Sequence, residues 1–478
     1  AQTCLNELIY SGAATIEAIV QVADSLAELG AAEQAINLLT GLIKNGQNTA
    51  QVVLGLEKIL SNNGAAPDAL QILESGLQDC DSALLRAKAE ELRNNLQQSG
   101  AHNPLLALRS EKKRIIFVSE IPKVREVKLA QALRTQGWEV ALLYKKKPNC
   151  TLENFFDATF QFHTAQQALY MARDMDSPIF HVFSSNVDNT SVLFVKERPG
   201  FILFDYVDIF DGMIYNHPTH MAAQRFCCTQ ADGLICRDLQ LAALCRMGNF
   251  QRPKHVLYYP EYCWDSGELQ IRPPDGEIHV VQAGWVDVEK NCSVKEVSYY
   301  DIFRSLTHAG INVHLYRHTL FAERDLETLY SDYFELQQET GCMHVHSHVP
   351  LEQVPKELSK YDLGINVVTH LVTGNSNYRH SKNFQNILTC GSARNTDYLD
   401  ACLPIITSPE VAFQFHKLKK RGVRIELTRE LLENPREVLE PFVSPDVREL
   451  VRQRRAGYTI QAHSERLVRF YERCLDNY

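Results

Sequence analysis

Residues 115–144 read IIFVSEIPKVREVKLAQALRTQGWEVALLY, and this segment indicates the fold class. The apolar run Ile115–Ser119 is typical of a buried strand, and Val127–Thr135 has the spacing of an amphipathic helix. Gly137 is suited to end that helix, and Val140–Tyr144 is a second apolar run. Two strands joined by a helix form a β-α-β unit, so the sequence predicts a parallel, doubly wound sheet.

The same alternation continues along the chain in two sets, separated by Pro273 and Pro274. Further strands are predicted at Ile179–Phe183, Phe201–Phe204, Gly233–Ile235, His279–Gln282, Asn312–Tyr316, His344–His346, Leu363–Val367 and Pro404–Ile406. Helices are predicted near Tyr300–Thr307, Leu351–Ser359 and Arg394–Ala401. The predicted fold class is therefore α/β with two tandem Rossmann-like lobes. Ligands of such sheets bind at the carboxyl ends of the strands, which places the predicted site in the cleft between the lobes.

The first hundred residues show helical spacing and almost no strand signal. Two segments in this region match at an offset of 34 residues: Gly30-Ala31-Ala32 with Ala35, and Gly64-Ala65-Ala66 with Ala69. This period resembles the tetratricopeptide helix-turn-helix over residues 16–83, with a final helix at 82–97. Such an all-α domain is expected to dock a partner, or else to act as a spacer or dimerisation arm.

Composition excludes some classes of protein. The 478 residues suggest two or three domains, and the net charge of −9 argues against nucleic acid as the main partner. No apolar run approaches the 18–20 or so residues of a membrane span, and no signal peptide is recognised. Thirteen cysteines without a CxxC pair favour reduced thiols, so a cytoplasmic protein is expected, with peripheral membrane contact left open.

Three segments of the second lobe carry a family resemblance. They are VQAGWVDVEKN at 281–291, HSHVPLEQVPKELSKYDLGINV at 346–367 and RNTDYLDACLPIIT at 394–407. In order and spacing they resemble retaining glycosyltransferases of the GT-B fold, the large family 4, also called group 1. The resemblance implies a nucleotide-sugar donor on the second lobe and an acceptor on the first. It divides the chain into helical repeats at 1–100, an acceptor lobe at 111–265, a donor lobe at 266–425 and bracing helices at 426–478.

The donor-binding residues are predicted from this resemblance and from the needs of a diphosphate. The predicted set is Gly284, Lys290, Arg394, Asn395, Asp397 and Tyr398. Lys290 and Arg394 would stabilise the departing diphosphate, Gly284 would let the backbone approach it, and Asp397 would hold the ribose hydroxyls. A solvated lysine, a surface arginine and an acid at a helix start are the competing interpretations.

The sequence also departs from the family. Trp285 stands where the family often has Arg, and Thr389 replaces the first acid of a Glu-x7-Glu pair that would end at Asp397. The segment 120–123, Glu-Ile-Pro-Lys, replaces a glycine-rich turn. The departures leave open whether the enzyme is retaining or inverting. A nucleotide-sugar epimerase and a catalytically inactive scaffold remain alternatives.

The candidate general bases are Asp208 and then Asp205, in the acidic segment after the strand Phe201–Phe204, because an inverting transferase deprotonates its acceptor. His181 is a weaker candidate for contacting the sugar or leaving group, and a satisfied core histidine is the competing interpretation. The alternating His344, His346 and His348 share one strand face, but no carboxylate or cysteine completes a metal site. The sequence therefore predicts metal-independent transfer, without a cofactor, to a protein or glycan acceptor.

Overall fold

A computed structural model gives the structure of the chain. The described residues are 15–28, 31–44, 46–47, 49–62, 66–80, 82–100, 113–148, 150–175, 177, 179–184, 189–206, 218–237, 255–264, 269–284, 286, 298–317, 330–367, 393–408 and 422–476. The chain forms two compact units. One combines Ala1–Glu111 with Phe160–Ser177, and the other combines Lys112–Thr159 with Pro178–Tyr478.

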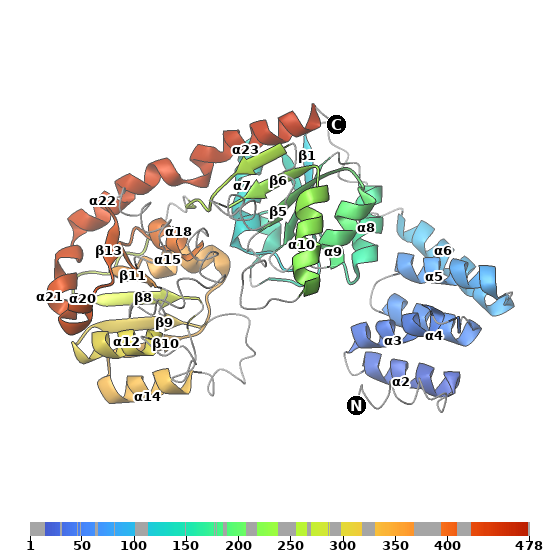
Figure 1. Cartoon of the computed structure of the whole chain (residues 1–478), viewed down its shortest axis with the longest axis horizontal. Helices are drawn as coiled ribbons and strands as arrows, with labels where there is room; N and C mark the ends of the chain where they lie inside the picture. The colour runs from blue at the N-terminus through green and yellow to red at the C-terminus, as the bar shows by residue number, and fades with distance from the viewer. Residues whose placement is uncertain are drawn as a thin grey trace. The chain divides into compact units, whose positions relative to one another are not determined.

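The N-terminal unit contains helices in antiparallel succession (Figure 1). They are α2 (Ile16–Glu28), α3 (Ala32–Lys44), α4 (Ala50–Asn62), α5 (Ala66–Asp79) and α6 (Ala83–Gly100). Helices α2 and α4 start 34 residues apart, and so do α3 and α5, as the sequence period predicts. Ala35 and Ala69 are fully buried, and a Cβ atom on Gly76 would lie 2.8 Å from Val53 of the neighbouring helix. Small side chains thus permit close helix packing, while the tetratricopeptide assignment stays a prediction.

The first lobe is built on a seven-stranded sheet in the order β3-β2-β1-β4-β5-β6-β7. Its strands are β1 (Arg114–Ser119), β2 (Glu139–Tyr144), β3 (Ala158–Gln161), β4 (Ile179–Ser184), β5 (Phe201–Tyr206), β6 (Gly233–Cys236) and β7 (His255–Tyr258). Its helices are α7 (Val124–Thr135), α9 (Asn189–Glu197) and α10 (Pro218–Gln230), while α8 (Ala165–Asp174) belongs to the N-terminal unit. Gly137 has φ +81°, a left-handed conformation that favours glycine, and it lies in the turn between α7 and β2.

The second lobe has a six-stranded sheet in the order β10-β9-β8-β11-β12-β13. Its strands are β8 (His279–Ala283), β9 (Asn312–Tyr316), β10 (Met343–His346), β11 (Leu363–Asn366), β12 (Ile405–Thr407) and β13 (Arg424–Glu426). The helices are α12 (Tyr299–His308), α14 (Ser331–Thr340), α15 (Val354–Leu358), α18 (Ala393–Asp400), α20 (Arg429–Glu433), α21 (Pro435–Leu439), α22 (Pro445–Arg455) and α23 (Ile460–Leu475). A capping box between Ser298 and Asp301 starts α12.

Strand order locates the ligand-binding edge of each lobe. Neighbouring strands of the second sheet pair in parallel, as do β2-β1-β4-β5-β6-β7 of the first. In both sheets the chain order reverses once, between β1 and β4 and between β8 and β11. Each reversal is a topological switch point, where parallel sheets bind ligands beyond their carboxyl ends. The prediction of two Rossmann-like lobes is confirmed.

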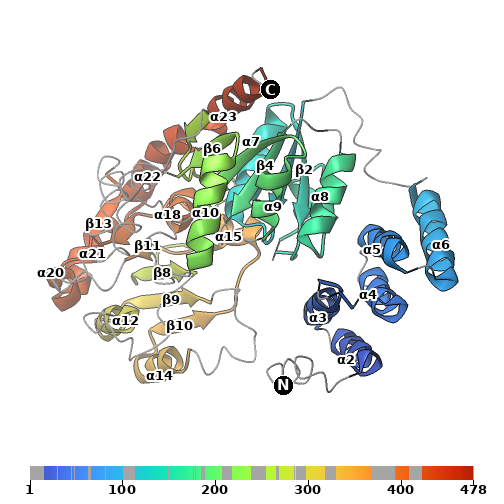
Figure 2. The same ribbon diagram turned by 45° about the vertical axis from the view of Figure 1, so that its right-hand side comes forward.

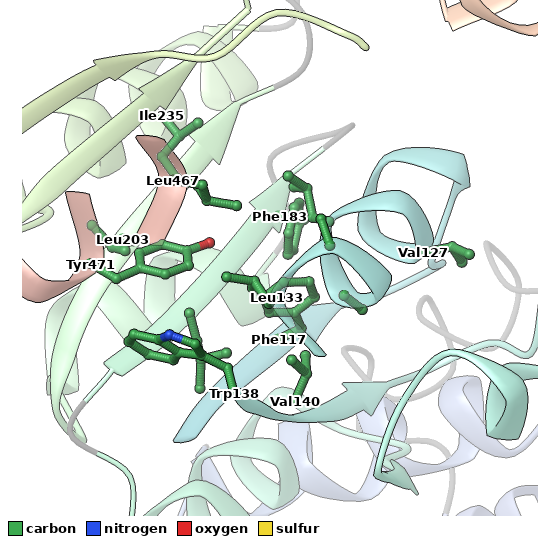
Figure 3. Close-up of a cluster of buried hydrophobic side chains, with 14 of the residues drawn as sticks. Phe117, Val127, Leu133, Trp138, Val140, Phe183, Leu203, Ile235, Leu467 and Tyr471 are labelled. Atoms are coloured by element: carbon green, nitrogen blue, oxygen red, sulfur yellow. The ribbon is translucent and has the colours of Figure 1, made fainter. Parts of the chain in front are cut away.

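The first lobe has its core between the sheet and helices α7 and α23 (Figure 3). Phe117 and Phe183 of the sheet pack with Leu133 of α7 and with Leu467 and Tyr471 of α23. Helix α9 packs against β4 and β5, and α10 lies alongside α9 (Figure 2). Apolar residues thus cover both faces of the strands, which explains their continuous apolar runs.

The C-terminal helices join the second lobe to the first (Figure 1). Val451 of α22 lies in an apolar cluster with Tyr398 and Leu399 of α18. The next helix, α23, packs against α7 through Leu467 and Phe470. Among the described helices, none is long and apolar enough to cross a membrane.

Candidate functional site

A cavity of about 400 Å³ lies between the two lobes. Its described wall comes from residues that follow β1, β2, β8, β9 and β10, together with α15 and α18. They are Ile121, Pro122, Lys123, Val124, Pro148, Ala283, Gly284, Tyr316, Arg317, His348, Val349, Leu351, Val354, Glu357, Leu358 and Asp397. The cavity therefore lies where the carboxyl ends of the two parallel sheets face one another, as the fold predicts.

Gly284, a predicted donor contact, lines this cavity, and Arg394, another one, lies beside it. Gly284 has φ +97°, and a Cβ atom there would lie 3.3 Å from Nη2 of Arg394. Nη1 of Arg394 donates to the hydroxyl of Tyr299 and to Oδ1 of Asn366, each at 3.2 Å. Nδ2 of Asn366 donates in turn to Oδ1 of Asn395 at 2.7 Å. The guanidinium is thus oriented before any ligand binds, while Asn395 is engaged and largely buried.

Asp397 lines the cavity, as expected of a donor-binding residue, but it also has a partner that sequence reasoning missed. Nζ of Lys128, on α7, lies 3.1 Å from Oδ1 of Asp397. Lys128 is only 2% exposed, and no local signal marks it, because a lysine on an amphipathic helix is ordinarily placed on the solvent face. Its burial is a consequence of the second lobe packing over α7.

Tyr398 is a predicted donor contact that the structure places elsewhere. Its side chain is fully buried, and its hydroxyl donates to the carbonyl of Ile365 at 2.9 Å and accepts from the amide of Ala283 at 3.1 Å. A Cβ atom on Gly364 would lie 2.5 Å from the tyrosine ring. Tyr398 therefore links α18 to β8 and β11 by hydrogen bonds and does not line the cavity. This corrects the prediction that Tyr398 contacts the donor.

Two cations at the cavity were not among the predicted site residues. Arg317 directly follows β9, and its Nε donates to the carbonyl of His346 at 3.1 Å while Nη2 donates to Ser347 at 2.9 Å. Lys123 precedes α7 and is exposed. Arg317 could have been found, because the strand Asn312–Tyr316 was predicted and the next residue lies at its carboxyl end.

Asp205 and His181 belong to a buried charge network in the first lobe. Asp205 accepts from Nε of Arg125 at 2.8 Å and lies 3.4 Å from Nε2 of His181, whose Nδ1 lies 2.8 Å from the hydroxyl of Tyr471. Burial alone would raise the pKa of Asp205, but Arg125 and His181 outweigh it and hold the pKa below its ordinary value. Burial lowers the pKa of His181.

These contacts correct the catalytic prediction for both residues. Asp205 and His181 are 0% exposed and do not line the cavity, so they link β4, β5, α7 and α23 rather than meet a substrate. The competing interpretation of His181 as a core histidine fits its burial and its contact with Tyr471. Asp208 and Lys290 lie outside the described residues, as do Trp285 and Thr389.

The histidines of the second sheet form a row of rings rather than a metal centre. Nδ1 of His279 lies 2.9 Å from Nε2 of His314, and Nδ1 of His314 lies 2.9 Å from Nε2 of His346. The ring of His344 stacks on His314 with a centroid separation of 4.6 Å. Within the described part of the chain, no group of three or more His, Cys, Asp or Glu residues is arranged to hold a metal ion.

Comparison with known proteins supports the fold. No protein-family model and no curated protein matches the sequence. Sucrose-phosphate synthase from Thermosynechococcus elongatus matches with a TM-score of 0.52 and 11% identity, over 77% of this chain and 100% of that one. A glycosyltransferase from Rickettsia africae matches with a TM-score of 0.50 and 10% identity, over 77% and 100% of the chains. An O-GlcNAc transferase from Thermobaculum terrenum covers 99% of this chain and 93% of its own, with a TM-score of 0.46 and 14% identity.

The first two matches share the two-lobed fold of this chain, the GT-B arrangement that the sequence resembles. At such low identity they bear on the fold alone. A shared fold does not determine function, which depends on the residues of the cavity itself.

Proposed function

We propose that this protein is a glycosyltransferase that moves a sugar from a nucleotide-sugar donor to a protein or glycan acceptor in the cleft between the lobes. One observation carries the proposal. The cavity joins the carboxyl edges of both sheets, and its lining includes Gly284, Arg317 and Asp397 of the second lobe together with Lys123 of the first. This arrangement offers both a donor wall and an acceptor wall.

Diphosphate departure is the step that the described residues support best. The leaving diphosphate carries negative charge that a protein site must stabilise as the glycosidic bond breaks. Arg394 and Arg317 are held by hydrogen bonds to neighbouring groups, and a planar guanidinium can bind a phosphate through two N–H groups. Gly284 leaves room beside Arg394 for a phosphate to approach the backbone. Lys290 completes this proposed set of cations.

Recognition of the nucleoside and activation of the acceptor belong to opposite walls. We assign the ribose hydroxyls to Asp397, because a carboxylate accepts hydrogen bonds from a vicinal diol. The acceptor hydroxyl is assigned to Asp208, since Asp205 is engaged in the core. In this scheme Asp208 removes the acceptor proton as the hydroxyl attacks the anomeric carbon.

Thermal stabilisation by nucleoside diphosphates tests donor binding first, because a ligand that binds only the folded state raises the melting temperature. Arg317→Met and Asp397→Ala are expected to weaken binding at least about tenfold. Arg436→Met is the matched control, since Arg436 pairs with Glu277 outside the cavity wall of the same lobe. Equal binding by all three variants would contradict the assignment.

Product analysis then distinguishes the reaction. Transfer releases a nucleoside diphosphate and yields a glycosylated acceptor, whereas an epimerase returns an isomerised nucleotide sugar. An inactive scaffold would bind none of the tested diphosphates. Turnover is expected to persist in EDTA, because protein cations take the place of a metal in the proposed site. Loss of turnover in EDTA with recovery on adding a divalent ion would exclude the metal-independent mechanism.

A further inference from the structure

A buried lysine connects the two lobes. Nζ of Lys128, on α7 of the first lobe, lies 3.1 Å from Asp397, 3.4 Å from Asp400 and 3.2 Å from the hydroxyl of Thr396, all on α18 of the second lobe. The carbonyl of Tyr262 lies at 3.5 Å. A single ammonium group thus contacts a full turn of α18.

The charges of this contact depend on one another. Burial raises the pKa of Asp397 and raises that of Asp400 to about 7, because both carboxyls are removed from water. Burial would lower the pKa of Lys128, but Asp397 and Asp400 outweigh it and the lysine stays charged. Without the lysine, the two acids would face each other one helical turn apart in the same buried place.

Asp397 occupies a special position in this contact. Its side chain is 19% exposed and lines the cavity, whereas Lys128 and Asp400 are almost completely buried. Lys128 engages Oδ1, so the rotation of the carboxylate is restricted. Because Lys128 comes from the opposite lobe, Asp397 is held in this way only when the lobes are closed.

We propose that Lys128 is a positioning residue: it holds the cleft closed by clamping the turn Asp397–Asp400, and it fixes Asp397 for the ribose of a bound nucleoside diphosphate. The ribose part rests on the proposed function, while closure of the lobes does not. Two readouts therefore separate the two parts.

The test compares Lys128→Met with the double variant Lys128→Met/Asp400→Asn, which removes the like-charge pair and protects folding if the single variant is unstable. Arg134→Met is the matched control, because Arg134 lies on the same helix and pairs with Asp157 within the first lobe. Ligand affinities are measured by calorimetry for UDP, GDP and ADP and for their 2′-deoxy counterparts. Small-angle X-ray scattering reports the radius of gyration without ligand.

In the wild type, the nucleoside diphosphate that binds is expected to bind about tenfold more tightly than its 2′-deoxy form, since a carboxylate loses one hydroxyl partner. Both Lys128 variants should lose most of this ratio and show a larger radius of gyration, while Arg134→Met keeps both values. An unchanged ratio in folded Lys128 variants overturns the positioning role. If the wild type binds none of the six compounds, the proposed function fails. The scattering then tests closure of the lobes by itself, and an unchanged radius of gyration in the Lys128 variants overturns the closure role of Lys128.

Discussion

Gly284, at the end of β8, and Arg394, in the first turn of α18, pack so closely that a Cβ atom on Gly284 would lie 3.3 Å from Nη2 of Arg394. The glycine has φ +97°, so any other residue would also strain the backbone. Two distant segments of the second lobe, both predicted to bind the donor, therefore meet at Gly284, which lines the cavity.

Gly284→Ala is expected to weaken nucleoside diphosphate binding at least about tenfold, because the new methyl group displaces Arg394 and strains the loop. Gly310→Ala is the matched control: Gly310 has φ +72° and nothing within 4 Å of a Cβ atom, so it carries a similar backbone cost away from Arg394. Calorimetric titration of both variants checks the prediction. If both variants lose the same affinity for the nucleoside diphosphate, the effect comes from backbone strain and not from displacement of Arg394.

Asp205→Asn is expected to lower the free energy of unfolding by about 3 kcal/mol, because Arg125 would lose the closer of its two buried acidic partners, Asp205 at 2.8 Å and Glu261 at 3.4 Å. Chemical denaturation measures this loss. At a temperature where the variant stays folded, kcat should remain close to that of the wild type, whereas Asp208→Asn should abolish turnover. A stable Asp205→Asn variant without activity would contradict this prediction and support a catalytic role for Asp205.

Most of the strands could be predicted from the sequence, because each strand of a parallel sheet is covered on both faces and therefore consists of a continuous run of apolar residues. The strands β3 and β13 were missed. β3 reads ATFQ, with one of its four residues buried, and β13 has three residues. Neither is long or apolar enough to stand out. Helix α7 begins at Val124 rather than Val127, since its first turn carries charged residues that are buried.

The site was predicted in part, and the misses have one physical cause. Gly284 and Asp397 line the cavity because strand ends and helix starts face the cleft in this fold, while their contact with a donor stays a prediction. Asp205 was misjudged and Lys128 was missed because both are charged yet buried, and burial of a charge depends on partners distant in sequence. Arg125 lies 80 residues from Asp205, and Asp397 lies 269 residues from Lys128. No window of the sequence contains both members of either pair.

The row of histidines in the second sheet predicts a pH dependence of stability. Burial, together with the neighbouring rings of His344, His346 and His279, lowers the pKa of His314 to about 2. The unfolded chain takes up a proton near its ordinary pKa of about 6.5, while the folded protein does not, so folding becomes less favourable as pH falls below that value. The slope from this residue approaches about 1.4 kcal/mol per pH unit.

Replacing His314 by leucine should reduce that slope between pH 6 and pH 4, even if the variant is less stable at pH 7. Urea denaturation at several pH values measures the difference. His308→Leu is the control, because His308 is exposed and pairs with Glu339 at the surface of the same lobe. If His314→Leu and the wild type lose stability in parallel on acidification, His314 is not the group responsible.

The helical unit is expected to serve the acceptor rather than the donor, since α2–α6 precede the first strand and supply none of the described residues of the cavity wall. A chain that begins at Ser110 should keep its affinity for the nucleoside diphosphate. Its transfer to a protein or glycan acceptor should fall mainly through a higher KM, because a tethered docking surface raises the local concentration of acceptor at the cleft.

The segment Phe160–Ser177 forms one compact unit with these helices, so the monodispersity of the shortened chain must be measured first. Aggregation, or loss of diphosphate binding, would show that the helices are needed to complete the fold, and the docking role would then be abandoned. A folded, diphosphate-binding chain with unchanged KM would equally remove it.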